Sequence, residues 1–273
     1  MKYIIVFILV LCLTSQIFAS PKKNGNDYLT VKAMASHTEL TANSQLMLIF
    51  DFKIQKGWHI YWKNPGDTGL PTDIKIDTDD KFKTEGIIWA VPKMFPFKDM
   101  VIYGYDDSVR LIVPLNIPKD MKYGTYNVKA YVDFLVCKEE CLPGKDTFNI
   151  VFKVSDKSQL SSGITNINLS AYPINASNEQ ITTVILNDTL LTDIQINPLR
   201  DAQYYAEFYP EDQGYYIYSG IKATINENLV SLKLPLNKYR EEDPKELKGI
   251  LIFRNLDGHQ ASGSFYVKKQ IMK

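Results

Sequence analysis

The sequence predicts an all-β protein with two β-sandwich domains, and three observations support this fold class. The chain is rich in aromatic residues, with 17 Tyr, 13 Phe and 3 Trp among 273 residues, and aromatic and β-branched side chains favour strands. Apolar residues alternate with polar ones in many short runs, as in strands that bury one face. Gly and Pro punctuate the gaps between these runs, as turns require.

The composition excludes some classes of protein. The 31 basic and 31 acidic residues give a formal net charge of zero. Binding to nucleic acid or to an anionic membrane surface needs a basic excess, so neither is expected as a partner. Apolar residues make up 45% of the chain, too many for a disordered protein and normal for a globular one.

Residues 1–19 have the organisation of a secretory signal peptide. Lys2 is a minimal positive region, and the eleven apolar residues of Tyr3–Leu13 are too few to span a bilayer. Cleavage after Ala19 would remove Cys12 and leave a periplasmic protein without a membrane span. An uncleaved N-terminal anchor is the alternative.

Residues 20–155 predict the first domain. Period-two alternation gives each of its clearest runs one apolar face, as expected for half-buried strands of a sandwich or barrel. These runs are Leu46–Ile54, Val109–Leu115, Tyr126–Val136 and Phe148–Val154. Turns are expected between runs, at Asn64-Pro65-Gly66, Leu70-Pro71, Ile117-Pro118 and Leu142-Pro143-Gly144.

Residues 156–180 are rich in Ser and Asn and predict a linker. Residues 181–273 predict a second domain, an immunoglobulin-like sandwich of about seven short strands. Its strands are expected at Ile181–Leu186, Thr192–Ile196, Gln203–Phe208, Gly214–Tyr218, Leu229–Leu234, Gly249–Phe253 and Ser264–Val267. The charged segment Lys238–Leu247 is expected to be a loop or a short helix, and Asn255–Gly258 a hairpin turn.

The strongest local signal is the pair Cys137 and Cys141, which follows the best alternating strand. Residues four apart in an extended strand lie about 13 Å apart, whereas a disulfide needs Cα atoms within about 7 Å. If the two cysteines pair, the strand must therefore end at Cys137 and turn, with Pro143-Gly144 directing the chain into the next strand.

Three kinds of chemistry are open to this pair. A short disulfide ring adds less stability than a long one, which favours a bond that opens and closes by thiol–disulfide exchange. A static clip and a two-cysteine metal site are the alternatives, although no nearby His completes a metal site. Lys138 would favour a thiolate and Glu139 and Glu140 would oppose it.

A second signal is the segment GWHIYWKNPGDTGLPT at residues 57–72. Alternation of Trp58, Ile60 and Trp62 predicts a strand with a large aromatic core face. His59 falls on the other face with Tyr61, so we expect it to face solvent or to pack on a loop. The remaining histidines, His37 and His259, are isolated and provide neither a catalytic triad nor zinc-ligand spacing.

Together these segments resemble the periplasmic N-terminal domain of the DsbD/ScsB thiol:disulfide interchange proteins. The resemblance rests on GWHIYWKNPGDTGLPT and VCKEECLPG, with Ile88–Pro92 and Tyr103-Gly104-Tyr105 between them and Phe208–Asp212 and Gly249–Leu251 in the second half. It implies an immunoglobulin-like fold and a reversible disulfide. Only Cys137 and Cys141 carry over as catalytic residues, and no cofactor is implied.

The resemblance also implies partners. Full-length family members continue into membrane helices and a thioredoxin-like domain, and this sequence has neither. We therefore expect thioredoxin-like exported domains and a separately encoded membrane electron-transfer protein as partners. The leading hypothesis is a relay that passes reducing equivalents through Cys137 and Cys141 to exported proteins. The alternatives are a binding or assembly module with a structural disulfide and a copper-handling protein, since copper(I) favours thiolates.

Overall fold

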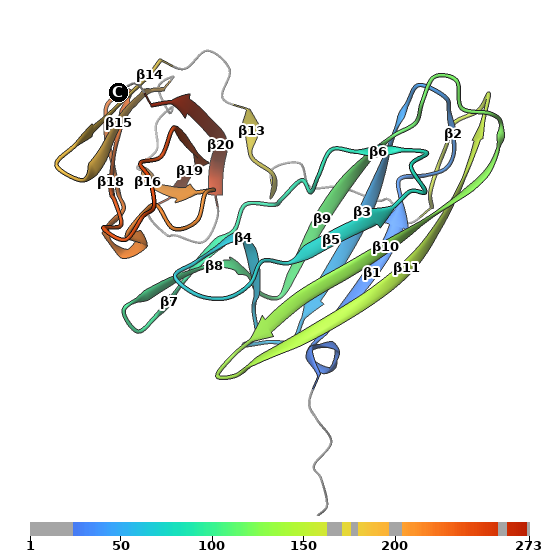
Figure 1. Ribbon diagram of the computed structural model, residues 1–273, viewed down its shortest axis with the longest axis horizontal. Helices are drawn as coiled ribbons and strands as arrows, with labels where there is room; N and C mark the ends of the chain where they lie inside the picture. Colours follow the sequence, from blue (N-terminus) through green and yellow to red (C-terminus); the bar gives the residue numbers. More distant parts are fainter. Residues whose placement is uncertain (1–23, 163–170, 176–179, 197–203, 256–260, 272–273) are drawn as a thin grey trace, which may run out of the picture.

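The computed structural model describes residues 24–162, 171–175, 180–196, 204–255 and 261–271 (Figure 1). Within these ranges the regular structure consists of strands in five sheets and short 3₁₀ turns, which confirms the all-β class. The expected signal peptide, residues 1–19, lies outside the described residues. No helix in the described ranges is long and apolar enough to cross a membrane.

The N-terminal part of the chain forms three sheets. The first has the order β1-β3-β9-β6, the second β12-β2-β11-β10-β5 and the third β4-β8-β7. Their bounds are β1 Leu29–Ala35, β2 His37–Thr41, β3 Gln45–Ile54, β4 Ile60–Gly66, β5 Asp73–Asp77, β6 Lys83–Thr84, β7 Lys93–Phe97, β8 Met100–Tyr105, β9 Ser108–Asn116, β10 Gly124–Cys137, β11 Cys141–Ser155 and β12 Gln159–Leu160.

The C-terminal part forms two further sheets, of order β13-β20-β19-β16 and β14-β15-β18-β17. Among the described strands, none of β13–β20 joins a sheet of β1–β12, and the C-terminal group lies at the upper left of Figure 1, above β4, β7 and β8. Their bounds are β13 Ile174–Asn175, β14 Ile181–Leu186, β15 Thr189–Gln195, β16 Tyr204–Pro210, β17 Lys222–Asn226, β18 Leu229–Pro235, β19 Glu246–Asn255 and β20 Ala261–Gln270.

The predicted strands of the N-terminal part are confirmed, and the hairpin of β10 and β11 is the longest. Burial alternates along β10, where Val128, Ala130, Val132 and Phe134 face the core, because successive side chains of a strand point to opposite faces. The expected turn at Leu142-Pro143-Gly144 is wrong. Lys138–Glu140 make the turn, and Pro143 already faces Leu135 in the ladder.

Two further expectations are corrected. Gly214–Tyr218 is not a strand: it contains one isolated bridge at Tyr216 and runs into a 3₁₀ turn, Tyr218–Gly220, because Gly214 has a positive φ of 82° that breaks extended backbone. The strand in this region is β17, which was not predicted. Asn64-Pro65-Gly66 is not a gap either, since it forms the end of β4.

The segment predicted as a linker carries a short strand at each end. β12 pairs with β2, and β13 pairs with β20. Between these strands, the backbone oxygen of Ala171 accepts a hydrogen bond from Val91 N at 2.8 Å.

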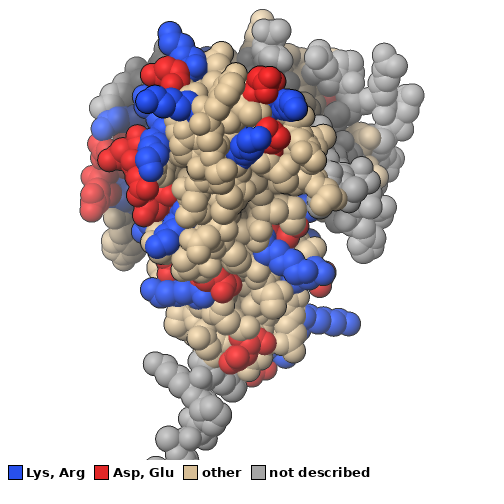
Figure 2. Space-filling model, turned by 90° about the vertical axis from the view of Figure 1, so that its right-hand side faces the viewer, with Lys and Arg blue, Asp and Glu red and all other residues tan. Residues whose placement is uncertain are grey.

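The surface carries charges of both signs. On the face shown in Figure 2, basic and acidic side chains are intermixed, and a band of uncharged residues runs between the charged groups. This agrees with the balanced composition.

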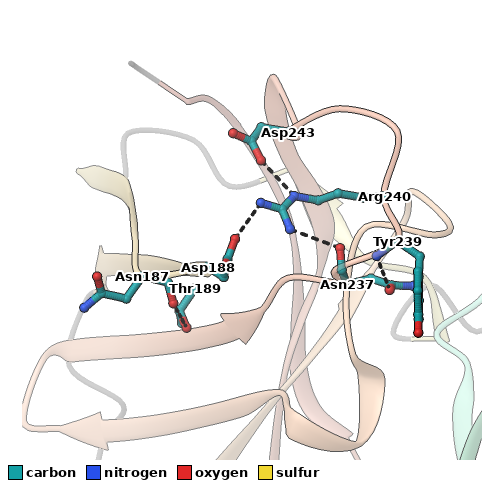
Figure 3. A network of polar contacts seen from close by, with 7 residues as sticks. All are labelled: Asn187, Asp188, Thr189, Asn237, Tyr239, Arg240 and Asp243. Atoms are coloured by element: carbon teal, nitrogen blue, oxygen red, sulfur yellow. Dashed lines mark hydrogen bonds and ion pairs between the residues drawn. The ribbon is translucent and has the colours of Figure 1, made fainter.

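In the charged segment Lys238–Leu247, residues 238–245 form a loop and the last two residues begin β19. Arg240 holds this loop in place (Figure 3). The guanidinium donates to Asp243 at 2.8 Å, to Asp188 at 2.7 Å and to the backbone oxygen of Asn237 at 3.0 Å. Asp188 belongs to the tight turn between β14 and β15, so Arg240 ties the loop to that hairpin. The hairpin turn expected at Asn255–Gly258 falls mostly on residues outside the described ranges.

Candidate functional site

The two cysteines lie at the tip of the β10–β11 hairpin. β10 ends at Cys137 and β11 begins at Cys141, and the two residues face each other as the last pair of the ladder. This pairing brings their Cα atoms to 4.2 Å, and a disulfide joins the sulfurs. The long regular ladder therefore delivers both cysteines to one point, as the expected turn after Cys137 requires.

The two cysteines differ in exposure. Cys137 is 2% exposed: its side chain packs in a buried cluster with Tyr61 and Ile102, and its backbone N–H and C=O each pair with His59, at 2.9 Å. Cys141 is exposed, as is the turn Lys138–Glu140. Cys141 is therefore the exposed partner of the disulfide and Cys137 the buried one.

Tyr61 supplies the polar contact to the disulfide. This β4 residue is 2% exposed, and its hydroxyl donates to Cys137 Sγ at 3.1 Å and lies 3.7 Å from Cys141 Sγ. Burial raises the pKa of Tyr61, so the hydroxyl stays protonated and remains a donor at neutral pH. Tyr61, Cys137 and Ile102 form a small buried cluster separate from the main core.

Gly69 sets the position of the Tyr61 ring. A Cβ on Gly69 would lie 2.1 Å from Cε1 of Tyr61, and Gly69 has a φ of +106°. Only glycine tolerates both the close approach and this backbone conformation. The loop after β4 therefore packs directly on the Tyr61 ring, whose hydroxyl lies at the sulfurs.

His59 borders the site without adding charge to it. Its ring stacks on Phe95 of β7 at 5.3 Å and meets Tyr61 edge-on at 5.2 Å. Burial lowers the pKa of His59, with Asp106 opposing the shift, so the imidazole is neutral at neutral pH. It is half-buried, packed between aromatic rings, and not solvent-facing.

The N-terminal 3₁₀ turn, Gly25–Asp27, contacts the hairpin near its tip. The side chain of Asn26 donates to the backbone oxygen of Lys145 and accepts from its N–H, both at 3.1 Å. Gly144 lets Phe134 pack across the ladder, since a Cβ on it would lie 2.3 Å from that ring. These contacts tie the tip region of the hairpin to the N-terminal turn.

The structure brings together both predicted site residues, and it adds two that sequence reasoning missed as site residues. Tyr61 and His59 lie on the strand face that was expected to point away from the core. The aromatic strand and the cysteine hairpin were recognised as separate signals, but nothing in either segment showed that they meet. In the described part of the chain, no cluster of three or more His, Cys, Asp or Glu could hold a metal ion.

Comparison with known proteins agrees with this geometry. Residues 26–153 match the family described as "Thiol:disulfide interchange protein DsbD, N-terminal". This part of the chain belongs to the DsbD N-terminal domain family. The residues matched to the DsbD family include both cysteines, Tyr61 and the β10–β11 hairpin except the last two residues of β11. No curated protein sequence matches the chain.

Among solved structures, the chain is similar to the N-terminal periplasmic domain of ScsB from Proteus mirabilis. The sequences are 17% identical, the TM-score is 0.65, and the match covers 92% of this chain and 96% of that one. The shared fold thus extends beyond the DsbD segment into the C-terminal part. The E. coli chaperone DraB, 9% identical over 88% of this chain and 98% of that one, has a TM-score of only 0.25 and supports no argument.

Proposed function

We propose that this protein is a periplasmic thiol:disulfide interchange relay in which Cys137 and Cys141 are the catalytic residues. The family membership supports thiol:disulfide interchange, and the ScsB structure it resembles is a periplasmic domain. The observation that carries the proposal is the asymmetry of the disulfide. One cysteine is exposed at a hairpin tip, and the other is buried with a tyrosine hydroxyl on its sulfur.

The reductive half-reaction begins at the exposed sulfur. A thiolate of a reduced thioredoxin-like partner attacks Cys141 Sγ, the bond between Cys141 and Cys137 breaks, and its electron pair passes to Cys137. Cys137 leaves as a thiolate while Cys141 is held in a mixed disulfide with the partner. The second thiolate of the partner then attacks the partner sulfur of the mixed disulfide. This releases Cys141 as a thiolate and leaves the partner with an internal disulfide.

Tyr61 assists this step because its hydroxyl already contacts the leaving sulfur. Hydrogen bonds to charged acceptors are stronger than those to neutral ones, so the contact at 3.1 Å strengthens when Cys137 becomes a thiolate. A stabilised thiolate is also the better leaving group. The disulfide is therefore easier to open with Tyr61 in place than without it.

The oxidative half-reaction runs in reverse on a different partner. The thiolate of Cys141 attacks a disulfide in an exported protein and forms a mixed disulfide with one of its sulfurs. Cys137 then attacks Cys141, which restores the internal disulfide and releases the exported protein as a dithiol. Two electrons and two protons have moved from the thioredoxin-like donor to the exported acceptor, and a separately encoded membrane protein would renew the donor. The relay needs no cofactor.

The proposal includes the organisation of the chain. A signal peptide of residues 1–19 directs export, residues 20–155 and 181–273 form two immunoglobulin-like sandwiches, and residues 156–180 connect them. The separate sheets of the N-terminal and C-terminal parts support this division. If this division is right, residues 20–155 and residues 181–273 should each fold when expressed alone, as judged by a cooperative urea transition for each.

Trapping of mixed disulfides tests the relay. Cys137→Ala leaves an exposed Cys141 with no resolving thiol, so it should accumulate disulfide-linked adducts with thioredoxin-like exported proteins. Cys141→Ala leaves only the buried Cys137 and should form far fewer, and the double variant should form none. Absence of adducts from Cys137→Ala, with a wild-type disulfide that resists a reduced thioredoxin, would contradict the proposal.

The same variants separate the relay from a structural disulfide. A ring this short restricts the unfolded chain by only about 2 kcal/mol in the chain-entropy model. The double Cys→Ala variant should therefore lose at most about that much unfolding free energy while losing all exchange activity. A larger loss together with unreactive cysteines would favour a binding module. Stoichiometric copper(I) binding by the reduced protein alone would favour copper handling.

A further inference from the structure

The C-terminal part of the chain contacts β4 next to the residue that touches the disulfide. β4 pairs with β8 at Ile60, Tyr61 and Gly66, and the ladder is irregular between Tyr61 and Gly66. The backbone of the intervening residues therefore needs other hydrogen-bond partners. The segment Pro210–Gln213, which begins at the last residue of β16, contacts this part of β4 through the Asn64 side chain and the Lys63 backbone.

Asn64 is the centre of this contact. It is 0% exposed, and its Nδ2 donates to the backbone oxygens of Pro210 at 2.8 Å and Asp212 at 3.4 Å. Its Oδ1 accepts from Gly66 N at 3.0 Å and from the Tyr218 hydroxyl at 3.3 Å. Both the nitrogen and the oxygen of the amide are thus hydrogen-bonded, to β4 itself at Gly66 and to the C-terminal part at Pro210, Asp212 and Tyr218.

Two neighbours reinforce the contact. Gln213 Nε2 donates to the backbone oxygen of Lys63 at 2.9 Å. The ammonium of Lys63 forms an ion pair with Glu211 and donates to the Tyr266 hydroxyl at 2.5 Å. Burial lowers the pKa of Lys63 to about 8 and raises that of Glu211 to about 7. Both shifts favour the neutral form, because burial removes each group from water.

An aromatic cluster closes the other side of β4. Trp62 points away from Tyr61, as alternation along a strand requires, and meets Tyr103 of β8 edge-on at 6.3 Å. Tyr103 in turn stacks on Tyr209 at 4.7 Å and meets Tyr218 at 5.6 Å. At successive positions β4 therefore points Tyr61 at the disulfide and Trp62 at an aromatic cluster shared with the C-terminal part.

We propose that Asn64 is a positioning residue, through which the segment Pro210–Gln213 fixes β4 and so holds the Tyr61 hydroxyl on Cys137 Sγ. The C-terminal part of the chain thereby tunes how readily the disulfide is reduced. This inference rests on the proposed function for its biological meaning. Its chemical content, a coupling between Asn64 and the redox equilibrium, can be measured without any protein partner.

A double-mutant cycle tests it on the full mature chain. The equilibrium constant between the disulfide and dithiothreitol is measured for the wild type, Asn64→Ala, Tyr61→Phe and the double variant. Each single change should shift the constant toward the disulfide, by roughly two- to thirty-fold, as expected for residues on one coupling path. If Asn64 acts through Tyr61, the double variant should shift no further than Tyr61→Phe alone.

Two further variants keep the test decisive. Gln213→Ala removes an exposed side chain and should fold even if Asn64→Ala does not; it should shift the constant in the same direction by less. Thr192→Val removes a buried hydroxyl, which bonds Thr183 at 3.0 Å, in the C-terminal part away from β4. It should lower stability and leave the constant unchanged.

The proposal is overturned if the shifts of Asn64→Ala and Tyr61→Phe add in the double variant. It is also overturned if folded Asn64→Ala and Gln213→Ala both keep the wild-type constant, or if Thr192→Val shifts the constant as much as they do. Titration of the reduced proteins by thiolate ultraviolet absorbance gives a second readout, since Asn64→Ala should raise the pKa of Cys137 as Tyr61→Phe does. Failure of the trapping experiment would leave this cycle unaffected, so the two proposals fail separately.

Discussion

The two strand systems that meet at the disulfide are held in different ways. β10 and β11 form one unbroken antiparallel ladder, from the pair of Gly124 with Val154 to the pair of Cys137 with Cys141. The ladder of β4 is interrupted, and the strand is held by the side-chain amide of Asn64. This amide donates to the backbone oxygens of Pro210 and Asp212, which lie 146 and 148 positions further along the chain. The hairpin presents the reactive sulfurs, and β4 supplies the group that tunes them. Local pairing is enough for the first task, whereas the second needs the whole fold.

The largest effect in this comparison is expected from Trp62→Ala. Trp62 is fully buried on β4, and replacing a core Trp or Phe with Ala typically costs about 3–5 kcal/mol. Phe152→Ala on β11 is the matched variant, since Phe152 is 1% exposed. Both should lower the unfolding free energy measured in urea by similar amounts, but only Trp62→Ala should also shift the redox equilibrium with dithiothreitol. Equal redox shifts would show that β4 has no special role.

Two glycine substitutions give the next largest effect. Gly144→Ala forces a Cβ against Phe134 in the hairpin, and Gly69→Ala forces one into the Tyr61 ring beside β4. Overpacking of this kind typically costs about 1–3 kcal/mol, so both variants should unfold at lower urea concentration. Gly69→Ala should in addition make the disulfide harder to reduce, because it displaces the Tyr61 hydroxyl. The comparison breaks down if Gly144→Ala changes the redox equilibrium more than Gly69→Ala.

The smallest effect concerns pH. Burial lowers the pKa of His59 from its ordinary value of 6.5, so the unfolded chain binds a proton at His59 more readily than the folded one. The stability that depends on neutral His59 is present above pH 6.5 and is lost as the pH falls below that value. His59→Phe keeps an aromatic ring against Phe95 and should lose less stability in acid than the wild type. Parallel urea midpoints for the two proteins across that pH range would contradict this.

Prediction from sequence succeeded where local pattern decides structure. The alternating runs became β3, β9, β10 and β11 because period two places one face of each strand in the core. It failed where backbone geometry overrode the pattern: Gly214 breaks an expected strand, and Pro143 lies within a strand instead of a turn. Alternation also assigned Tyr61 to a face outside the core, although the neighbouring hairpin buries that face as well.

What the sequence by itself determined is the class of the protein and the position of its reactive pair. The alternation and the turn residues specify strands, and the spacing of Cys137 and Cys141 after a long strand requires a hairpin tip if they pair. Only the tertiary structure decided that Cys141 is exposed and Cys137 is buried, and that the Tyr61 hydroxyl donates to Cys137. The physical reason is that strand periodicity acts over a few residues, whereas burial and hydrogen bonding at the disulfide come from β4, from the loop that carries Gly69 and from a segment that contacts Asn64 across the fold.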